Sequence, residues 1–168
     1  MDFETLRVHQ DGAVLFAAIA APPMNLLGTE LVRDLVSLIQ RAEADDACHV
    51  LVFTSADPDY FISHVDVIRI NEYREEAAKL TTEPSIGILF RYLSASRLVT
   101  IAQIEGRVRG AGSEFVLACD MLCRTRVGDL QPAGTSIRPH SRRGRYSAPD
   151  ASDGSCTGAR GDAERGRL

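Results

Sequence analysis

The stretch at residues 101–120, IAQIEGRVRGAGSEFVLACD, predicts a strand, a glycine-bearing loop and a helix in succession. The apolar run at 98–104 is the strand, three glycines stand in the loop at 106–112, and an apolar helix is expected over 113–119. Backbone N–H groups at the start of a helix, beside small residues, form a site for an anion or a developing oxyanion. The functional centre of the chain is therefore expected at this loop.

The glycine spacing argues against three familiar loop types. A dinucleotide-binding loop needs G-x-G-x-x-G, but Phe115 stands where the third glycine would let helix and strand pack closely. A nucleophile elbow needs G-x-S-x-G, but Ser113 is flanked by Ala111 and Phe115. The sequence also lacks the Gly-Lys-Ser/Thr of a P-loop. An oxyanion-type loop remains, with Glu114 one turn inside the helix as a candidate base or, alternatively, as a solvent-facing or capping residue.

The rest of the chain up to Arg124 alternates between strand and helix patterns. Asp11-Gly12 is a hairpin turn signal, and Thr29 is expected to cap a helix. Strands are expected at 3–9, 13–20, 49–54, 98–104 and 121–124, and helices at 29–45, 65–79, from Pro84 onward and at 113–119. This order predicts an α/β or α+β fold in which helices cover at least one sheet.

The composition changes abruptly after Cys123. The 168-residue chain carries a net charge of −4, but its first 123 residues carry −8 and its last 45 carry +4. The tail has few large apolar groups, so disorder is expected from about Arg126 onward. The chain uses 18 Arg and one Lys, which indicates a GC-rich gene. The tail is thus either a shifted reading frame or a native basic segment, and we divide the chain into a core at 1–125 and an Arg/Gly/Ser-rich tail at 126–168.

The bulk composition argues against several classes of protein. The negative charge disfavours nucleic-acid binding, and no apolar run is long enough to cross a bilayer. The N-terminus lacks the pattern of a signal peptide, so a cytoplasmic location is expected. The four cysteines include no C-x-x-C pair, so no metal site is expected. Cys48, Cys119 and Cys123 lie in or beside apolar runs and are expected to be free thiols.

Three separated motifs resemble the signature of the crotonase superfamily, the enoyl-CoA hydratases and isomerases. The segment PPMNLL at 22–27 resembles that family's Pro-x-x-Asn-x-Leu turn, and DYFISHVD at 59–66 resembles its Phe-x-Ala-Gly-x-Asp loop. The glycine loop matches in register at Gly106, Gly110, Gly112, Glu114, Ala118, Cys119 and Asp120. The resemblance covers residues 3–124 and implies the N-terminal part of a spiral of ββα units.

The resemblance also implies a chemistry. An acyl-CoA thioester would react through an enolate whose oxygen is held by the backbone N–H groups of Ser63 and Ala111, and Glu114 would be the catalytic glutamate. No cofactor is implied beyond the CoA thioester substrate. Ser63 and Ala111 replace the family's usual Ala and Gly, but backbone donors survive such changes. The residues expected to contact the substrate are Asn25, Phe61, His64, Asp66, Gly110 and Gly112.

Several departures from the family pattern limit the prediction. Hydratases carry a second glutamate in a Gly-Gln-Pro-Glu segment, where this chain has Gln131-Pro-Ala-Gly. We therefore expect proton transfer rather than efficient hydration, with an inactive remnant or a CoA-binding or interaction module as the alternative. A dinucleotide oxidoreductase ranks third. His64 occupies a usual glycine position and either narrows the acyl pocket or faces solvent, and Arg107 and Arg109 either meet CoA phosphates or are solvated.

The family assembles as trimers or hexamers through a C-terminal region whose pattern this chain does not show.

Overall fold

The computed structural model describes residues 2–124, 130–131 and 157–158. The elements, in order, are β1 (Leu6–Asp11), β2 (Val14–Ile19), α1 (Thr29–Ala44), β3 (Val50–Ser55), β4 (Tyr60–Ile62), α2 (Ile70–Thr81), α3 (Ile86–Ser94), β5 (Val99–Ile104), β6 (Arg107–Arg109), α4 (Ala111–Ala118), β7 (Met121–Arg124), β8 (Leu130–Gln131) and β9 (Thr157–Gly158). The expected alternation of strands and helices is confirmed.

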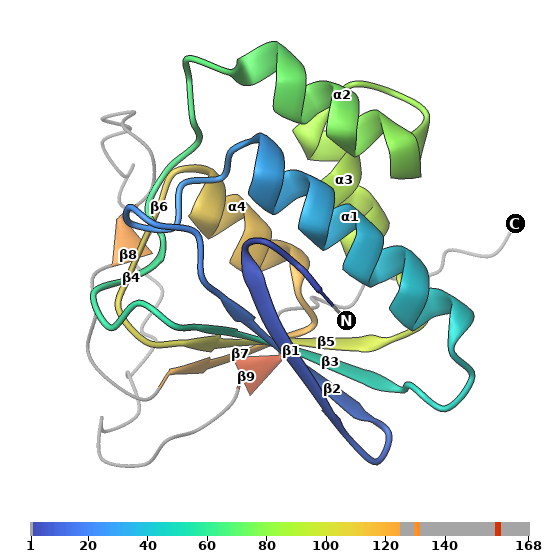
Figure 1. The fold of residues 1–168 in the computed structure, drawn as a ribbon. Helices are drawn as coiled ribbons and strands as arrows, with labels where there is room; N and C mark the ends of the chain where they lie inside the picture. Colours follow the sequence, from blue (N-terminus) through green and yellow to red (C-terminus); the bar gives the residue numbers. More distant parts are fainter. Residues whose placement is uncertain (1, 125–129, 132–156, 159–168) are drawn as a thin grey trace, which may run out of the picture.

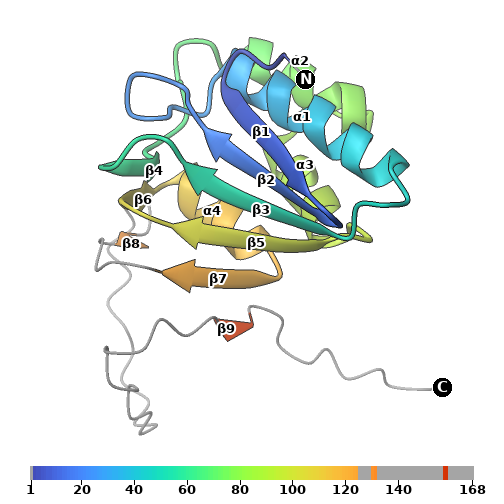
Figure 2. The ribbon, with the colours of Figure 1, turned by 60° about the horizontal axis from the view of Figure 1, so that its bottom comes forward.

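The larger sheet has the strand order β1-β2-β3-β5-β7-β9. Its four central strands run parallel, whereas β1 and β9 lie antiparallel at the edges. Figures 1 and 2 show α1, α3 and α4 over one face of this sheet, with α2 outermost. The four strands from β2 to β7 alternate with helices along the chain, which is the connection that a parallel sheet needs.

The core lies between this sheet and its helices. Leu51 and Phe53 of β3 are fully buried, and Phe115 of α4 contacts Phe53 edge to face at 4.9 Å between ring centroids. The α1 face expected from the 3.6-residue period is buried at Val32, Leu35, Val36, Ile39 and Ala42. The hairpin signal is also confirmed, because Gly12 has φ +56° between paired β1 and β2.

A smaller parallel sheet, β4-β6-β8, lies where the chain leaves β3 and β5. Gly106 has φ +91°, and a β-carbon there would lie 2.6 Å from the Asp59 carbonyl carbon, so only glycine lets the two turns meet. We expected a plain loop at 106–112 and no strand at β4. Three-residue strands carry too little periodicity to be seen in a sequence, and these two are defined by their pairing with each other and, for β6, with β8.

The expected cap of α1 and the expected start of α2 are wrong. The residue preceding α1 is Gly28, and the Thr29 hydroxyl donates to Glu72 at 3.3 Å instead of capping α1. Helix α2 begins at Ile70 rather than at 65, because the Asp66 carboxylate accepts from the Ile68 N–H at 3.0 Å in a local turn that competes with the helix. The third helix also begins slightly later than expected.

That third helix, α3, starts at Ile86 behind Ser85, whose hydroxyl accepts from the Ile88 N–H at 3.4 Å. Pro84 therefore precedes the cap instead of opening the helix.

Asp120, which follows α4, connects the end of this helix to strand β5 of the sheet. The Asp120 carboxylate accepts from both the N–H and the hydroxyl of Thr100 at 2.9 Å. Cys119 is free and buried, and desolvation raises the pKa of its thiol to about 12. Cys48 is also free and buried, but Cys123 is disulfide-bonded, which corrects the expectation of a free thiol there. Cys123 lies on β7, where every side chain is partly exposed, so its thiol is not enclosed by the core.

The expected division of the chain at 125/126 falls mostly outside the described residues. In the tail only 130–131 and 157–158 are described, and they form the short strands β8 and β9. No helix in the described part of the chain is long and apolar enough to cross a membrane.

Candidate active site

A close backbone contact joins the end of β4 to the start of α4. Gly112, the second residue of α4, packs against Ile62, the last residue of β4, and a β-carbon at Gly112 would lie 2.9 Å from the Ile62 β-carbon. The next residue after Ile62 is Ser63, and the residue before Gly112 is Ala111. The glycine therefore brings together the two chain segments that carry the expected N–H donors.

The two expected donors differ in how they are positioned. Ala111 is the first residue of α4, so no helical carbonyl lies one turn earlier to accept from its N–H. Ser63 directly follows β4, whose pairing with β6 holds the segment in place. Two backbone N–H groups from neighbouring elements, at the positive end of a helix, can stabilise an oxygen that gains negative charge.

Glu114 lies three residues after Ala111 on the same face of α4. Its side chain is exposed, as is Leu117 a further three residues along, at 66%. Its own N–H donates to the Gly110 carbonyl at 3.3 Å. The carboxylate is therefore accessible from outside and lies one helical turn from the Ala111 N–H, where a base for a carbon next to a bound carbonyl is needed.

His64 and Gly110 meet at the mouth of this loop. Gly110 has φ +54°, and a β-carbon there would lie 3.1–3.2 Å from the Cδ2 and Nε2 atoms of the His64 ring. The imidazole is exposed to solvent and packs on the glycine that precedes the helix. Of the two orientations that the sequence left open, the structure shows an exposed ring that also borders the loop.

The side chain of Asn25 makes its hydrogen bonds within the protein. Its buried amide accepts from the Ala21 N–H at 2.9 Å and donates to the carbonyls of Tyr60 and Phe61 at 3.1 Å. It also donates to the Ser55 hydroxyl at 2.9 Å. Asn25 thus fixes β4, and any contact between its side chain and a substrate would compete with these bonds.

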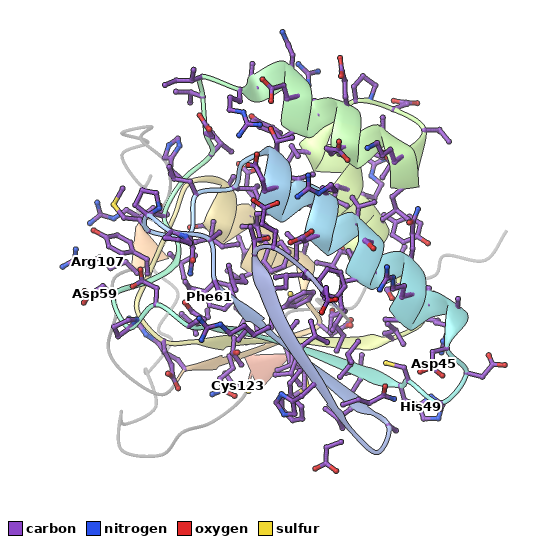
Figure 3. All side chains as sticks on the ribbon, viewed as in Figure 1. Asp45, His49, Asp59, Phe61, Arg107 and Cys123 are labelled. Atoms are coloured by element: carbon purple, nitrogen blue, oxygen red, sulfur yellow. The ribbon has the colours of Figure 1, made fainter. Side chains whose placement is uncertain are left out.

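Phe61 is likewise a core residue. It is fully buried, and Figure 3 shows it directed into the molecule, where its ring lies 6.4 Å from that of Phe115. Asn25 and Phe61 are thus both buried, and their expected contact with a substrate stays a prediction.

A cavity of about 450 Å³ lies beside the turn at 22–27, and Asp66 is on its wall. Arg69 also lines it, but its guanidinium is engaged by Glu30 at 2.7 Å and by Glu72 at 2.7 Å. The hydrogen bond from Arg69 lowers the pKa of Glu30. With Glu4 also on the wall, this cavity is acidic and does not suit a phosphate group.

Arg107 and Arg109 lie exposed on β6 at the edge of the molecule. Figure 3 shows Arg107 near Asp59 at that edge, and the Arg107 guanidinium lies 5.5 Å from the centre of the Tyr60 ring. This edge is the cationic part of the candidate site.

Two buried hydroxyls beside the loop have no hydrogen-bond partner, Ser63 Oγ and Ser113 Oγ. Buried polar groups are normally satisfied, so both call for an explanation. The sequence predicted no role for Ser113, because its neighbours do not fit a nucleophile elbow. Among the described residues, no group of three or more His, Cys, Asp or Glu could hold a metal ion.

Comparison with known proteins identifies the family of this fold and site. The family model described as enoyl-CoA hydratase/isomerase matches residues 9–128. The chain belongs to the enoyl-CoA hydratase/isomerase family. The resemblance seen in the three sequence motifs is confirmed, and so is the crotonase-type fold.

Two curated members of the enoyl-CoA hydratase/isomerase family match about the same segment. The alpha subunit of a fatty acid oxidation complex from Idiomarina loihiensis is 30% identical over 118 residues, which are 68% of this chain and 16% of that protein. Probable enoyl-CoA hydratase 2, mitochondrial, from Arabidopsis thaliana is 27% identical over 117 residues, which are 68% of this chain and 38% of that protein. The match thus spans well under half of either relative.

Solved structures of the family agree with the fold. A crystal structure of a candidate enoyl-CoA hydratase from Streptomyces avermitilis is 47% identical, with a TM-score of 0.68, over 74% of this chain and 49% of that one. Pseudomonas aeruginosa DspI is 28% identical, with a TM-score of 0.62, over 76% of this chain and 52% of that one. The chain therefore spans about half the length of these two structures.

Proposed function

We propose that this chain binds an acyl-CoA thioester and transfers a proton at the carbon α or γ to the thioester carbonyl. The contact of Gly112 with Ile62 carries the proposal, because it holds the chain segments of Ser63 and Ala111, whose N–H groups are the proposed donors, next to each other at the start of α4. Glu114 on the same face of that helix supplies a carboxylate. Membership of the enoyl-CoA hydratase/isomerase family supports this substrate class.

The proposed step needs two kinds of group. The thioester oxygen accepts from the N–H groups of Ser63 and Ala111, and the Glu114 carboxylate takes a proton from the carbon. The C–H electron pair then becomes an enolate on the held oxygen, and Glu114 returns the proton to the α or the γ carbon. Each N–H donor contributes about 3 kcal/mol to stabilising such a charge. The fixed dipole of α4 adds to this at no cost of reorganisation.

The exposed guanidinium groups of Arg107 and Arg109 are the proposed partners of CoA phosphates. They stand on β6, immediately before Gly110 and α4, whereas the acidic cavity beside Asp66 and Arg69 would repel such groups. No cofactor is proposed beyond the CoA thioester itself.

A catalytically inactive remnant, or a CoA-binding or interaction module, is the second candidate. Position 133, where the resemblance implies a second glutamate, is Ala. A protein of this kind would bind acyl-CoA through the same loop without moving a proton.

The role of Glu114 as the base is tested by the rate of deuterium exchange from solvent into a saturated acyl-CoA, compared between the wild type and Glu114→Gln. The glutamine keeps the size and hydrogen bonding of the side chain but removes the base, so exchange should fall by about a hundredfold or more. Glu75→Gln, at an exposed position on α2, is the matched control and should leave exchange unchanged. Equal exchange in the wild type and Glu114→Gln would show that Glu114 is not the base.

Titration calorimetry with acyl-CoA separates the two candidates. Binding without exchange in the wild type would favour the binding module, and neither binding nor exchange would favour the inactive remnant. The family's trimers or hexamers, a cytoplasmic location and the absence of nucleic-acid binding stay predictions for this chain.

A further inference from the structure

His64 places a second titratable group at the start of α4. Its ring lies against Gly110, with Nε2 only 3.2 Å from where a glycine β-carbon would stand. Gly110 is bonded to Ala111, the expected donor, so the imidazole lies beside the slot where the thioester oxygen would be held. His64 itself directly follows Ser63, the other expected donor.

The ring's hydrogen bonds indicate which nitrogen is free. Nδ1 of His64 lies 3.3 Å from the Val65 carbonyl oxygen, to which it can only donate, since both would otherwise present lone pairs. Nδ1 then carries the proton, and Nε2 presents its lone pair toward Gly110.

The imidazole ring of His64 is accessible to water. The His64 side chain is open to solvent in the described part of the chain, so a water molecule can reach Nε2. Ser63, the residue before His64, has a buried hydroxyl without a hydrogen-bond partner. Buried hydroxyls are normally hydrogen-bonded, so a polar group of a bound ligand would satisfy this one.

We propose that His64 is a second acid–base residue of this site and activates water for addition to a 2-enoyl-CoA. This inference rests on the proposed function, since it uses the same thioester pocket and the same Glu114. It changes one expectation: the sequence predicted poor hydration because a single carboxylate remained, and an imidazole supplies the missing second group.

The proposed reaction adds one water molecule across the C2–C3 double bond of a 2-enoyl-CoA. Nε2 takes a proton from water while the water oxygen bonds to C3 and the C2–C3 π electrons move onto the thioester oxygen. That oxygen is held by the N–H groups of Ser63 and Ala111. The imidazolium of His64 then passes its proton through the Glu114 carboxylate to C2, and the carbonyl re-forms. The product is a 3-hydroxyacyl-CoA, with no oxidant or reductant consumed.

The experiment measures two reactions on the full chain. One is ¹⁸O incorporation from water into a 2-enoyl-CoA, which reports hydration, and the other is deuterium exchange into a saturated acyl-CoA, which reports Glu114. His64→Gln should lower hydration by about a hundredfold or more while keeping exchange within a fewfold of the wild type. His64→Gly should lose hydration equally and recover it when free imidazole is added, which a structural role would not allow.

The matched control is a substitution at a second exposed histidine, His49. His49→Gln alters an exposed histidine that Figure 3 shows at the opposite end of the molecule from Asp59 and Arg107, and it should leave both reactions unchanged. A wild type that exchanges deuterium but does not hydrate, or a His64→Gln variant that hydrates normally, would overturn the role of His64. A wild type that does neither would overturn the proposed function, and this inference with it.

Discussion

Gly112 and Ile62 are packed so closely that the backbone of α4 touches the carbonyl group of β4 with no room for a side chain between them. We predict that Gly112→Ala lowers the free energy of unfolding by about 2 kcal/mol or more, because one methyl group must push the two elements apart. Chemical denaturation measures this effect, and acyl-CoA affinity should fall with it as the Ser63 and Ala111 N–H groups separate.

Gly87 is the control for that substitution. A β-carbon there would meet only the Ser85 hydroxyl, at 3.7 Å, in the exposed first turn of α3. Gly87→Ala should therefore raise stability by about 0.5–1 kcal/mol. Equal effects of the two alanines would contradict the tight contact at Gly112.

The unpartnered hydroxyl of Ser63 predicts a stabilising substitution. Ser63→Ala should raise the free energy of unfolding by about 1 kcal/mol, since a buried hydroxyl without a hydrogen bond costs about 1–3 kcal/mol. The contrasting variant is Ser94→Ala, whose hydroxyl donates to the carbonyls of Phe90 and Ala118 at 3.1 Å and should lose stability. A destabilised Ser63→Ala would mean that this hydroxyl has a partner in solution.

Asn25 should be among the polar residues least tolerant of change. Asn25→Asp removes the donors to Ser55 and to the Tyr60 and Phe61 carbonyls, and sets a carboxylate against two carbonyl oxygens. We expect a loss of about 3 kcal/mol in urea denaturation. Asn71→Asp, at an exposed position of α2, makes the same chemical change and should cost little. Similar losses for both variants would refute the anchoring role.

The buried thiol of Cys119 predicts a loss of stability at high pH. Its pKa is about 12 in the folded protein against an ordinary value of 9.0, so the unfolded chain releases the proton first as the pH rises. Stability should therefore fall between about pH 9 and 12, by up to about 1.4 kcal/mol per pH unit from this group. Cys119→Ala should lack that slope when both proteins are unfolded by urea across this range. Parallel curves for the two proteins would rule out the thiol as the cause.

The composition break after Cys123 predicts a result at the level of the gene. Translating the nucleotide sequence from codon 120 onward in the other two frames should give a Gln-Pro-Glu segment and an apolar continuation. If neither frame gives them, the basic tail is native.

The sequence by itself determined the order of the main elements, the buried face of α1 and the family. These follow from local patterns, since the 3.6-residue and two-residue periods and the positions of glycines need no partner to be seen. It also marked Glu114, because a carboxylate in an otherwise apolar helix is conspicuous. It misplaced the starts of α2 and α3, where the turn at Asp66 and the cap at Ser85 compete with propensity.

Only the tertiary structure decided how distant residues meet. The strands β4 and β6 exist through their pairing, and the contact of Gly112 with Ile62 aligns Ser63 with Ala111 across the loop. The ring of His64 reaches Gly110 for the same reason, and the side chain of Asn25 bonds to the backbone of β4. Such relations depend on the packing of segments far apart in the chain, and local periodicity carries no information about that packing.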